Sequence, residues 1–289
     1  NSRSAESGII KLAAQNDIIL SESDIASQGN NGIKILSEEG TIDVSNAVIN
    51  STNGATAASV VIQTAGHINL DGAQVISNAS TALPNPALLI ESTNDGISAK
   101  SAILTSTNSG KLLKIAAQGL IELDHTPVSS GGPISISTLG DISADSATLT
   151  AASNGGLLEL LAEGFIKLDQ ATLSSGGNIN IQTPGDISAK SANIFNNSDA
   201  SYGHSINIYS INGAIDLSTL EVAGIPQTVV NSPPGNINIK AKQDIWCISS
   251  SITASSNYSG MVLRFESTGQ GSKLYVDNAT LSGHSIKAY

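Results

Sequence analysis

The sequence contains very little cysteine, aromatic residue or arginine. Its 289 residues include one cysteine, one tryptophan, five tyrosines and three phenylalanines, and only Arg3 and Arg264 are arginines. A single cysteine says little about the cellular compartment. Cys247 stands at an inward position of its segment, which predicts a small core residue and not a reactive or metal-binding thiol.

Positive charge and long apolar runs are also scarce. The chain has 13 basic and 24 acidic residues, a net charge of −11, and this argues against nucleic-acid binding. No stretch of 18 apolar residues occurs, so we expect no membrane span. The segment "NSRSAESGIIKL" at the start does not have the pattern of a signal peptide.

The sequence has instead a repeat of 21 to 30 residues, marked by an aliphatic anchor. Apolar or small residues follow each anchor at the second, fifth and seventh positions, as Leu168, Ala171 and Leu173 follow Ile166. A constant inner spacing with a variable total length is typical of a solenoid. The anchors are Ile18, Ile42, Ile68, Ile97, Ile121, Ile142, Ile166, Ile187, Ile215, Ile245 and Leu274.

Each repeat predicts three short strands, because a second apolar pair such as Ile179 and Ile181 precedes the anchor. The repeats are too short for βαβ units. Parallel crossovers are nearly always right-handed, so we predict an all-β, right-handed parallel β-helix. It has three sheets, about eleven coils, a length of roughly 50 Å and one domain over residues 1–289. We expect it to be a segment of a longer fibre or a stacking subunit.

Three features are assigned to the corners between strands. Seven glycines stand two residues before an anchor, for example Gly140 and Gly185, and predict positive φ in a tight turn. Asp17, Asp141, Asp186 and Asp244 predict corner hydrogen bonds in preference to a metal site. The long Pro-containing segments 78–87 and 224–235 predict loops at the third corner, where recognition often resides.

The phrases "GGNINIQTPGDISAKSANI", "PGNINIKAKQDI" and "GGPISISTLGDISADSATLTAAS" resemble the repeats of the filamentous haemagglutinin-like family. These are bacterial β-helical exoproteins exported by two-partner secretion. The resemblance covers about residues 8 to 288. It implies an extracellular or bacterial cell-surface fibre, adhesin or matrix component, and it carries over no catalytic residues or cofactor.

Parallel β-helices also include polysaccharide lyases and hydrolases, so catalytic groups were sought. Glycosidic cleavage needs two carboxyl groups close together, but the outward row one residue after the anchors contains no two acids in adjacent coils. Arginine is almost absent and no "GGxGxD" calcium repeat occurs. The sequence therefore predicts no catalytic residue, no metal site and no cofactor.

Two outward features are candidates for binding or assembly. Trp246 and Tyr275 occupy adjacent places in the row after the anchors and are expected to point to solvent. Tyr209 is expected nearby on the preceding strand face, so the three are candidates for a partner or glycan contact. Asn180, Asn207 and Asn238 share one row in successive coils and predict an amide ladder that stabilises stacking.

Three functions are then compared. We favour a non-enzymatic structural component of a filament or matrix that self-associates end to end or continues into neighbouring coils. The alternative is an adhesin module that binds glycans or cells through its third-corner loops. A polysaccharide-degrading enzyme is the least favoured.

Overall fold

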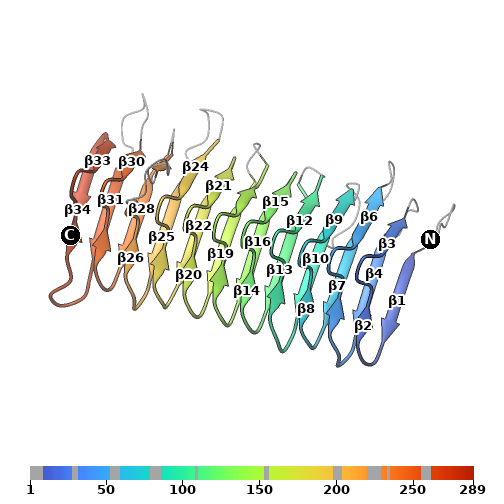
Figure 1. The fold of residues 1–289 in the computed structure, drawn as a ribbon. Coiled ribbons are helices and arrows are strands. Elements are labelled where there is room, and N and C mark those ends of the chain that lie inside the picture. The colour runs from blue at the N-terminus through green and yellow to red at the C-terminus, as the bar shows by residue number, and fades with distance from the viewer. Residues whose placement is uncertain are drawn as a thin grey trace.

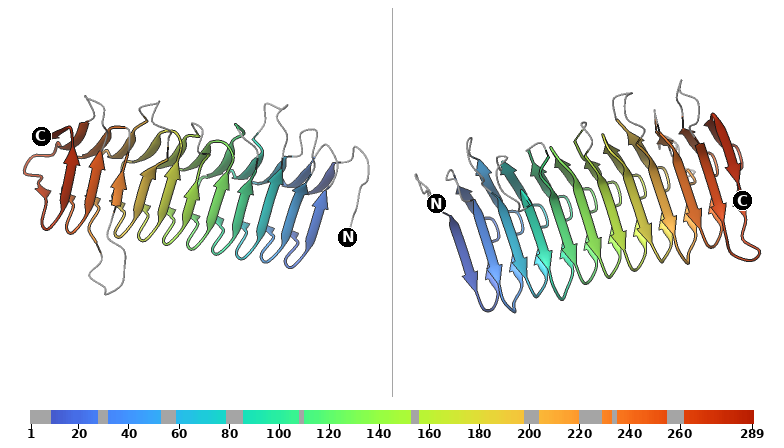
Figure 2. Two further views of the ribbon diagram at one scale, coloured as in Figure 1. Left: turned by 90° about the horizontal axis from the view of Figure 1, so that it is seen from above. Right: turned by 180° about the vertical axis from the view of Figure 1, so that it is seen from behind.

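The computed structural model is a stack of strands with its two ends at opposite ends of the stack (Figures 1 and 2). Three parallel sheets of twelve, eleven and eleven strands run the length of the rod, as the repeat predicted. The structure describes residues 9–27, 32–52, 59–78, 86–107, 110–152, 156–197, 204–219, 229–232, 235–254 and 262–289.

Each coil contributes one strand to each sheet. The first sheet contains β1 (Ile10–Ala14), β4 (Ile33–Ser37), β7 (Val60–Thr64), β10 (Leu88–Ser92), β13 (Leu113–Ala117), β16 (Ile134–Thr138), β19 (Leu158–Ala162), β22 (Ile179–Thr183), β25 (Ile206–Ser210), β28 (Ile237–Ala241), β31 (Val262–Ser267) and β34 (Ser285–Ala288). The second contains β2 (Ile18–Ile19), β5 (Ile42–Asp43), β8 (Ile68–Asn69), β11 (Ile97–Ser98), β14 (Ile121–Glu122), β17 (Ile142–Ser143), β20 (Ile166–Lys167), β23 (Ile187–Ser188), β26 (Ile215–Asp216), β29 (Ile245–Trp246) and β32 (Leu274–Tyr275). The third contains β3 (Asp24–Ser27), β6 (Val48–Thr52), β9 (Gln74–Asn78), β12 (Ile103–Ser106), β15 (Pro127–Ser130), β18 (Thr148–Thr150), β21 (Thr172–Ser175), β24 (Asn193–Asn196), β27 (Val229–Asn231), β30 (Ser251–Ala254) and β33 (Thr280–Gly283).

The core is one column of aliphatic side chains between the three sheets. The anchors pair in register from coil to coil, as Ile142 pairs with Ile166 and Ile166 with Ile187. These three side chains are at most 1% exposed. Because one coil alone leaves its inward side chains uncovered, stacking supplies most of their burial.

The first corner, which joins the first sheet to the second, corrects the prediction for its glycines. The positive-φ glycines are Gly32, Gly72, Gly110 and Gly271, and none of the seven predicted ones is among them. Space is the reason for glycine here, because a Cβ on Gly140 would lie 2.7 Å from the carbonyl carbon of Gly119 in the preceding coil. The corners of adjacent coils approach too closely for a side chain.

Hydrogen bonds between coils fill the same corner. The hydroxyl of Ser210 donates to the carbonyl of Gly185 at 2.6 Å and accepts from the backbone N–H of Gly213 at 3.0 Å. Thr183 makes the equivalent pair of bonds one coil earlier. The predicted corner role of the aspartates is confirmed. Asp17, Asp141, Asp186 and Asp244 each accept a bond from a backbone N–H of the following coil, at 2.7 to 2.8 Å.

Positive φ is found instead at the second corner, four residues after the anchors. Among the residues that the structure describes, nine other than glycine adopt it, with φ between 49° and 59°. Asparagine and histidine tolerate this conformation, but serine, glutamine and glutamate adopt it less readily. The nine are Glu22, Asn46, Ser101, His125, Ser146, Gln170, Ser191, Ser249 and Asn278.

The coil anchored by Ile215 departs from the predicted spacing. We expected Val222 at its inward third-strand position, but Val230 pairs with Ile194 and Ile252 and is fully buried. The extra residues therefore enter at the second corner, between β26 and β27, and part of the predicted third-corner loop 224–235 is the strand β27. Residues 79–85, 220–228 and 233–234 lie outside the described residues.

Candidate functional site

The predicted asparagine ladder runs along the outer face of the first sheet. The side-chain amide of Asn207 donates to Oδ1 of Asn180 at 2.9 Å, and that of Asn238 donates to Oδ1 of Asn207 at 2.8 Å. The register of β22, β25 and β28 places the three side chains one above another. The ladder is confirmed, and it orients the amides along the axis of the rod.

Tyr209 lies beside this ladder and not beside Trp246. It belongs to β25, and its hydroxyl donates to Oδ1 of Asn207 at 3.2 Å. Trp246 belongs to β29 in the second sheet. Tyr209 was expected on the preceding strand face, and it belongs to the first sheet, whereas Trp246 and Tyr275 belong to the second. Burial raises the pKa of the Tyr209 hydroxyl.

Next to Tyr209 the first-sheet face has a hollow of about 380 Å³, lined by Tyr209, Asn238, Ile239, Lys240, Arg264 and Glu266. We call it the first-sheet hollow. Its three charged residues are linked, because Glu266 accepts from Lys240 and from Arg264 at 2.7 Å each. The Arg264 guanidinium also lies 5.2 Å from the ring centre of Tyr289. This fixes one arginine over an aromatic ring.

Sequence reasoning missed the charged half of this hollow. Lys240 and Glu266 are adjacent in the sheet register, as are Asn238 and Arg264. The signal was present in the outward positions of the first-sheet strands, but only the asparagines were followed along that row. The hydrogen bond from Lys240, together with the charge of Arg264, lowers the pKa of the Glu266 carboxyl.

The charge of the chain is unevenly distributed. Residues 240–289 contain five basic and three acidic residues, a net charge of +2. Residues 1–239 contain eight basic and 21 acidic residues, a net charge of −13. Lys240, Arg264 and Glu266 of the first-sheet hollow thus belong to a net basic segment of an acidic protein, which favours an anionic ligand over a cationic one.

Trp246 and Tyr275 form a stacked pair on the second sheet. Their ring centres are 5.8 Å apart and their planes differ by 4°. Tyr275 is 37% exposed and Trp246 is half-buried. Each ring covers one face of the other, so part of the ring surface that could stack on a sugar is already used.

Acidic residues line the second corner in consecutive coils, a row that the sequence reading did not examine. Asp124 accepts bonds from the Ser143 hydroxyl at 2.7 Å and the Asp145 backbone N–H at 2.9 Å. Asp145 pairs with Lys167 at 2.8 Å, and this contact raises the pKa of the lysine. These carboxylates are hydrogen-bond and ion-pair partners between coils.

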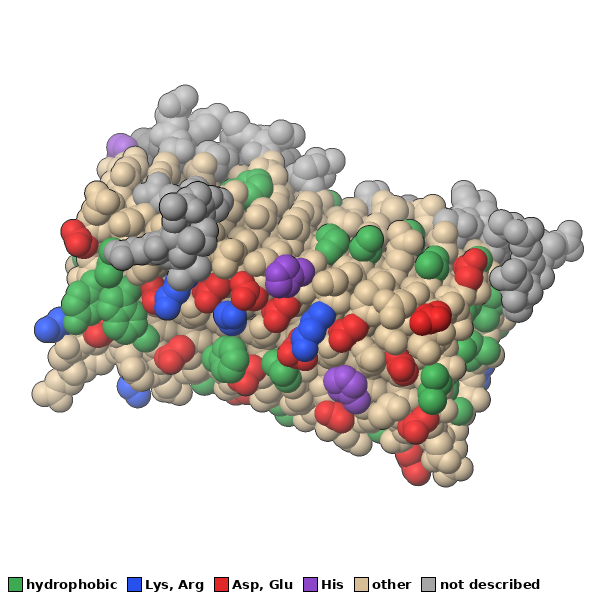
Figure 3. All heavy atoms as spheres, viewed as in Figure 1, with side chains coloured by type: hydrophobic (Ala, Val, Ile, Leu, Met, Phe, Trp, Pro, Cys, Tyr) green, Lys and Arg blue, Asp and Glu red, His purple; other side chains and the backbone are tan. Residues whose placement is uncertain are grey.

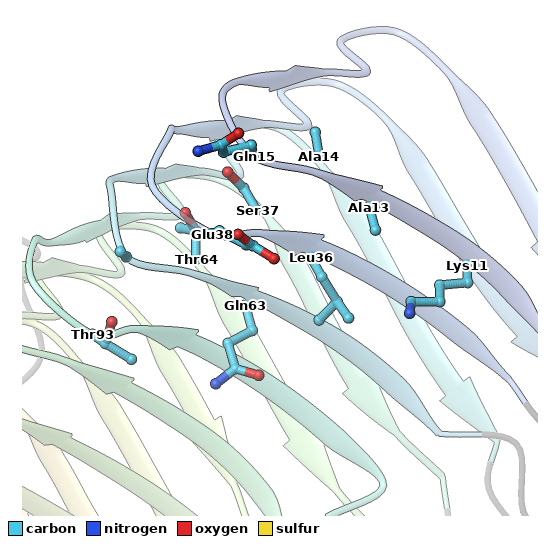
Figure 4. Close-up of a pocket in the computed structure, with 11 residues that line it drawn as sticks. Lys11, Ala13, Ala14, Gln15, Leu36, Ser37, Glu38, Gln63, Thr64 and Thr93 are labelled. Carbon is cyan, nitrogen blue, oxygen red and sulfur yellow. The ribbon is translucent and has the colours of Figure 1, made fainter.

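A second hollow, of about 530 Å³, lies near the first corner of the opening coils (Figure 4). Its hydroxyl groups belong to the corner network, since Ser37 donates to the carbonyl of Asn16 at 2.7 Å. Gln63 donates to Glu91 at 2.9 Å. Ser37, Thr64 and Gln63 are thus engaged in hydrogen bonds with groups outside the lining, which makes this hollow a weaker candidate than the first-sheet hollow.

Over the part of the chain that the structure describes, no three or more His, Cys, Asp or Glu side chains gather where a metal ion would bind. No helix within the described ranges is long and apolar enough to cross a membrane. Cys247 is buried, and burial raises its pKa to about 12.

No protein-family model, curated protein or solved structure matches the chain.

Proposed function

We propose that the protein is a non-catalytic rod that forms part of a filament or matrix outside the cell or on a bacterial cell surface. The observation that carries this proposal is the uninterrupted register of three parallel sheets around one aliphatic column. A fold whose contacts are all between neighbouring coils extends in one dimension without limit.

The polar ladders support a mechanical role. The amides of Asn180, Asn207 and Asn238 and the corner hydroxyls such as Ser210 connect coil to coil along the axis. Each bond resists separation or sliding of the coils that it joins. A rod built in this way displays side chains at a spacing of about 4.8 Å per coil.

Electron microscopy and small-angle scattering of the purified protein test this proposal. We expect rigid rods about 50 Å long that associate end to end or continue as longer fibres within a longer chain. Compact particles, or release of reducing sugar from acidic polysaccharides, would contradict it.

A second candidate function is adhesion to acidic glycans, favoured by the first-sheet hollow. Tyr209 offers an aromatic ring, Asn238 an amide, and Lys240 and Arg264 positive charge for a uronate or sulfate group. Arg264→Ala should abolish binding to an acidic-glycan array. Lys167→Ala, on the second sheet, should leave it unchanged, and equal loss in both variants would show non-specific attraction.

A further inference from the structure

Apolar side chains protrude from the first corner in five consecutive coils, those anchored by Ile121 to Ile215. Leu120, Leu139, Phe165 and Ile211 are 40, 59, 43 and 51% exposed, and half-buried Pro184 fills the remaining coil. We call these five residues the corner stripe. The first corners form a straight row of short turns along one edge of the rod (Figure 1).

The stripe is concentrated on this edge. The exposed large apolar side chains among the described residues number eleven, and four of them belong to these corners. Acidic residues are interspersed with apolar ones over the molecule (Figure 3). Within the corners, Asp141, Glu163 and Asp186 alternate with the stripe. Leu120 and Phe165 are the last residues of their corners, beside the second sheet, whereas Leu139, Pro184 and Ile211 are the first, beside the first sheet. One apolar group per coil over five consecutive coils is more than the scattered exposure of a soluble surface.

We propose that the corner stripe is a lateral interface with a second, antiparallel copy of this chain. A straight partner with the same spacing is needed to cover five corners at once, and another rod has that geometry. Phe165 is the central residue of the five. A two-fold axis through it would place Phe165 against Phe165 of the second copy and Leu139 against Pro184, which is a self-complementary arrangement.

Charge favours the antiparallel direction. A two-fold axis at Phe165 sets the coils of residues 240–289 opposite the coils of residues 33–107. Residues 33–107 contain two basic and six acidic residues, a net charge of −4, whereas residues 240–289 have a net charge of +2. An antiparallel pair brings the basic end of each rod toward these acidic coils of the other. A parallel pair would place like ends together.

The interface is expected to be weak for a single pair of rods. Stable interfaces bury about 1,200–2,000 Å² in total, and a five-residue stripe falls below that range. The carboxylates Asp141, Glu163 and Asp186 also face their counterparts across the two-fold axis. Longer filaments would gain strength because many stripes act together. The inference goes beyond the proposed rod role, since a rod can exist without lateral pairing.

Sedimentation velocity over a concentration series provides the first test. Wild-type protein should show a reversible monomer–dimer equilibrium. The double variant Leu139→Ser, Phe165→Ser should have a dimerisation constant at least tenfold weaker. Glu163→Gln should strengthen dimerisation, because it removes the repulsion between the two Glu163 carboxylates at the centre of the interface. Ile103→Ser is the matched control, because Ile103 is 41% exposed but lies on the third sheet. Scattering from each monomer must keep the rod shape, so a lost rod is distinguished from a lost interface.

Cysteine cross-linking tests the direction of pairing, with the buried Cys247 as an inert background. Phe165→Cys should form a disulfide-linked dimer. Leu139→Cys should cross-link to Pro184→Cys when the two variants are mixed, but not to itself. Self-linking of Leu139→Cys would show parallel pairing, and a protein that stays monomeric at every concentration would overturn the interface itself.

Discussion

At the residue scale, two conformational demands occupy different corners. Glycine at the first corner is required by the approach of the neighbouring coil, and positive φ is required at the second corner. The sequence revealed where the glycines recur but not why, because a glycine chosen for space and one chosen for φ look alike. The positive-φ row escaped notice because serine, glutamine and histidine fill much of it.

Two substitutions separate these demands. Gly140→Ala should destabilise the rod by about 1–3 kcal/mol, because the new methyl group meets backbone of the preceding coil. Gly110 is a positive-φ glycine at a third corner, between β12 and β13. Gly110→Asn should cost about 1 kcal/mol or less, since its Cβ meets nothing within 4 Å and asparagine tolerates its φ of +78°. Denaturant unfolding measures both, and equal costs would contradict the distinction.

The Glu266 ion pairs give a pH-dependent contribution to stability. The pKa of Glu266 is lowered in the folded state by Lys240 and Arg264. Its contribution is therefore present above the unfolded pKa of about 4.3 and is lost as the pH falls through the folded pKa. Glu266→Gln should lower the melting temperature slightly at pH 7 and not at pH 3, since exposed pairs contribute at most about 1 kcal/mol. Glu38→Gln, at an exposed first-corner position outside the corner stripe, is the control, and a difference that persists at pH 3 would contradict this origin.

At the element scale, strand identity followed from period-two alternation, and the aliphatic rows were predicted correctly. The exception is β27, where Val230 and not Val222 is inward. The extra residues between β26 and β27 move the third strand of this coil to a later position in the sequence. The alternation of apolar residues stays the same, so it does not show that the strand has moved. Only the register with Ile194 and Ile252 in neighbouring coils identifies the inward residue.

The asparagine ladder predicts unequal costs for equivalent substitutions. Asn207 takes part in two amide–amide bonds and Asn180 in one. Asn207→Ala should therefore destabilise the rod by about 1–2 kcal/mol and Asn180→Ala by about half of that. Thermal unfolding of both variants checks the ratio, and equal effects would mean that the amides act through solvent and not through each other.

At the scale of the whole molecule, the fold could be predicted because stacking repeats one set of contacts. The candidate sites could be predicted less well. Tyr209 and Trp246 are separated onto two faces by the corner between them, and Lys240, Arg264 and Glu266 meet only through pairing of β28 with β31. A row of residues within a single sheet could be predicted from the sequence, because the repeat fixes its register.

The most direct test of the account is a set of distances between spin labels along one outward row. Labels at Asp43→Cys and Ser143→Cys are four coils apart, and labels at Asp43→Cys and Asp216→Cys are seven coils apart. Buried Cys247, with its pKa raised to about 12, should remain unlabelled. We predict distances near 19 and 34 Å, rising by about 4.8 Å per coil. Distances that do not increase in proportion to the number of coils would contradict the continuous parallel stack.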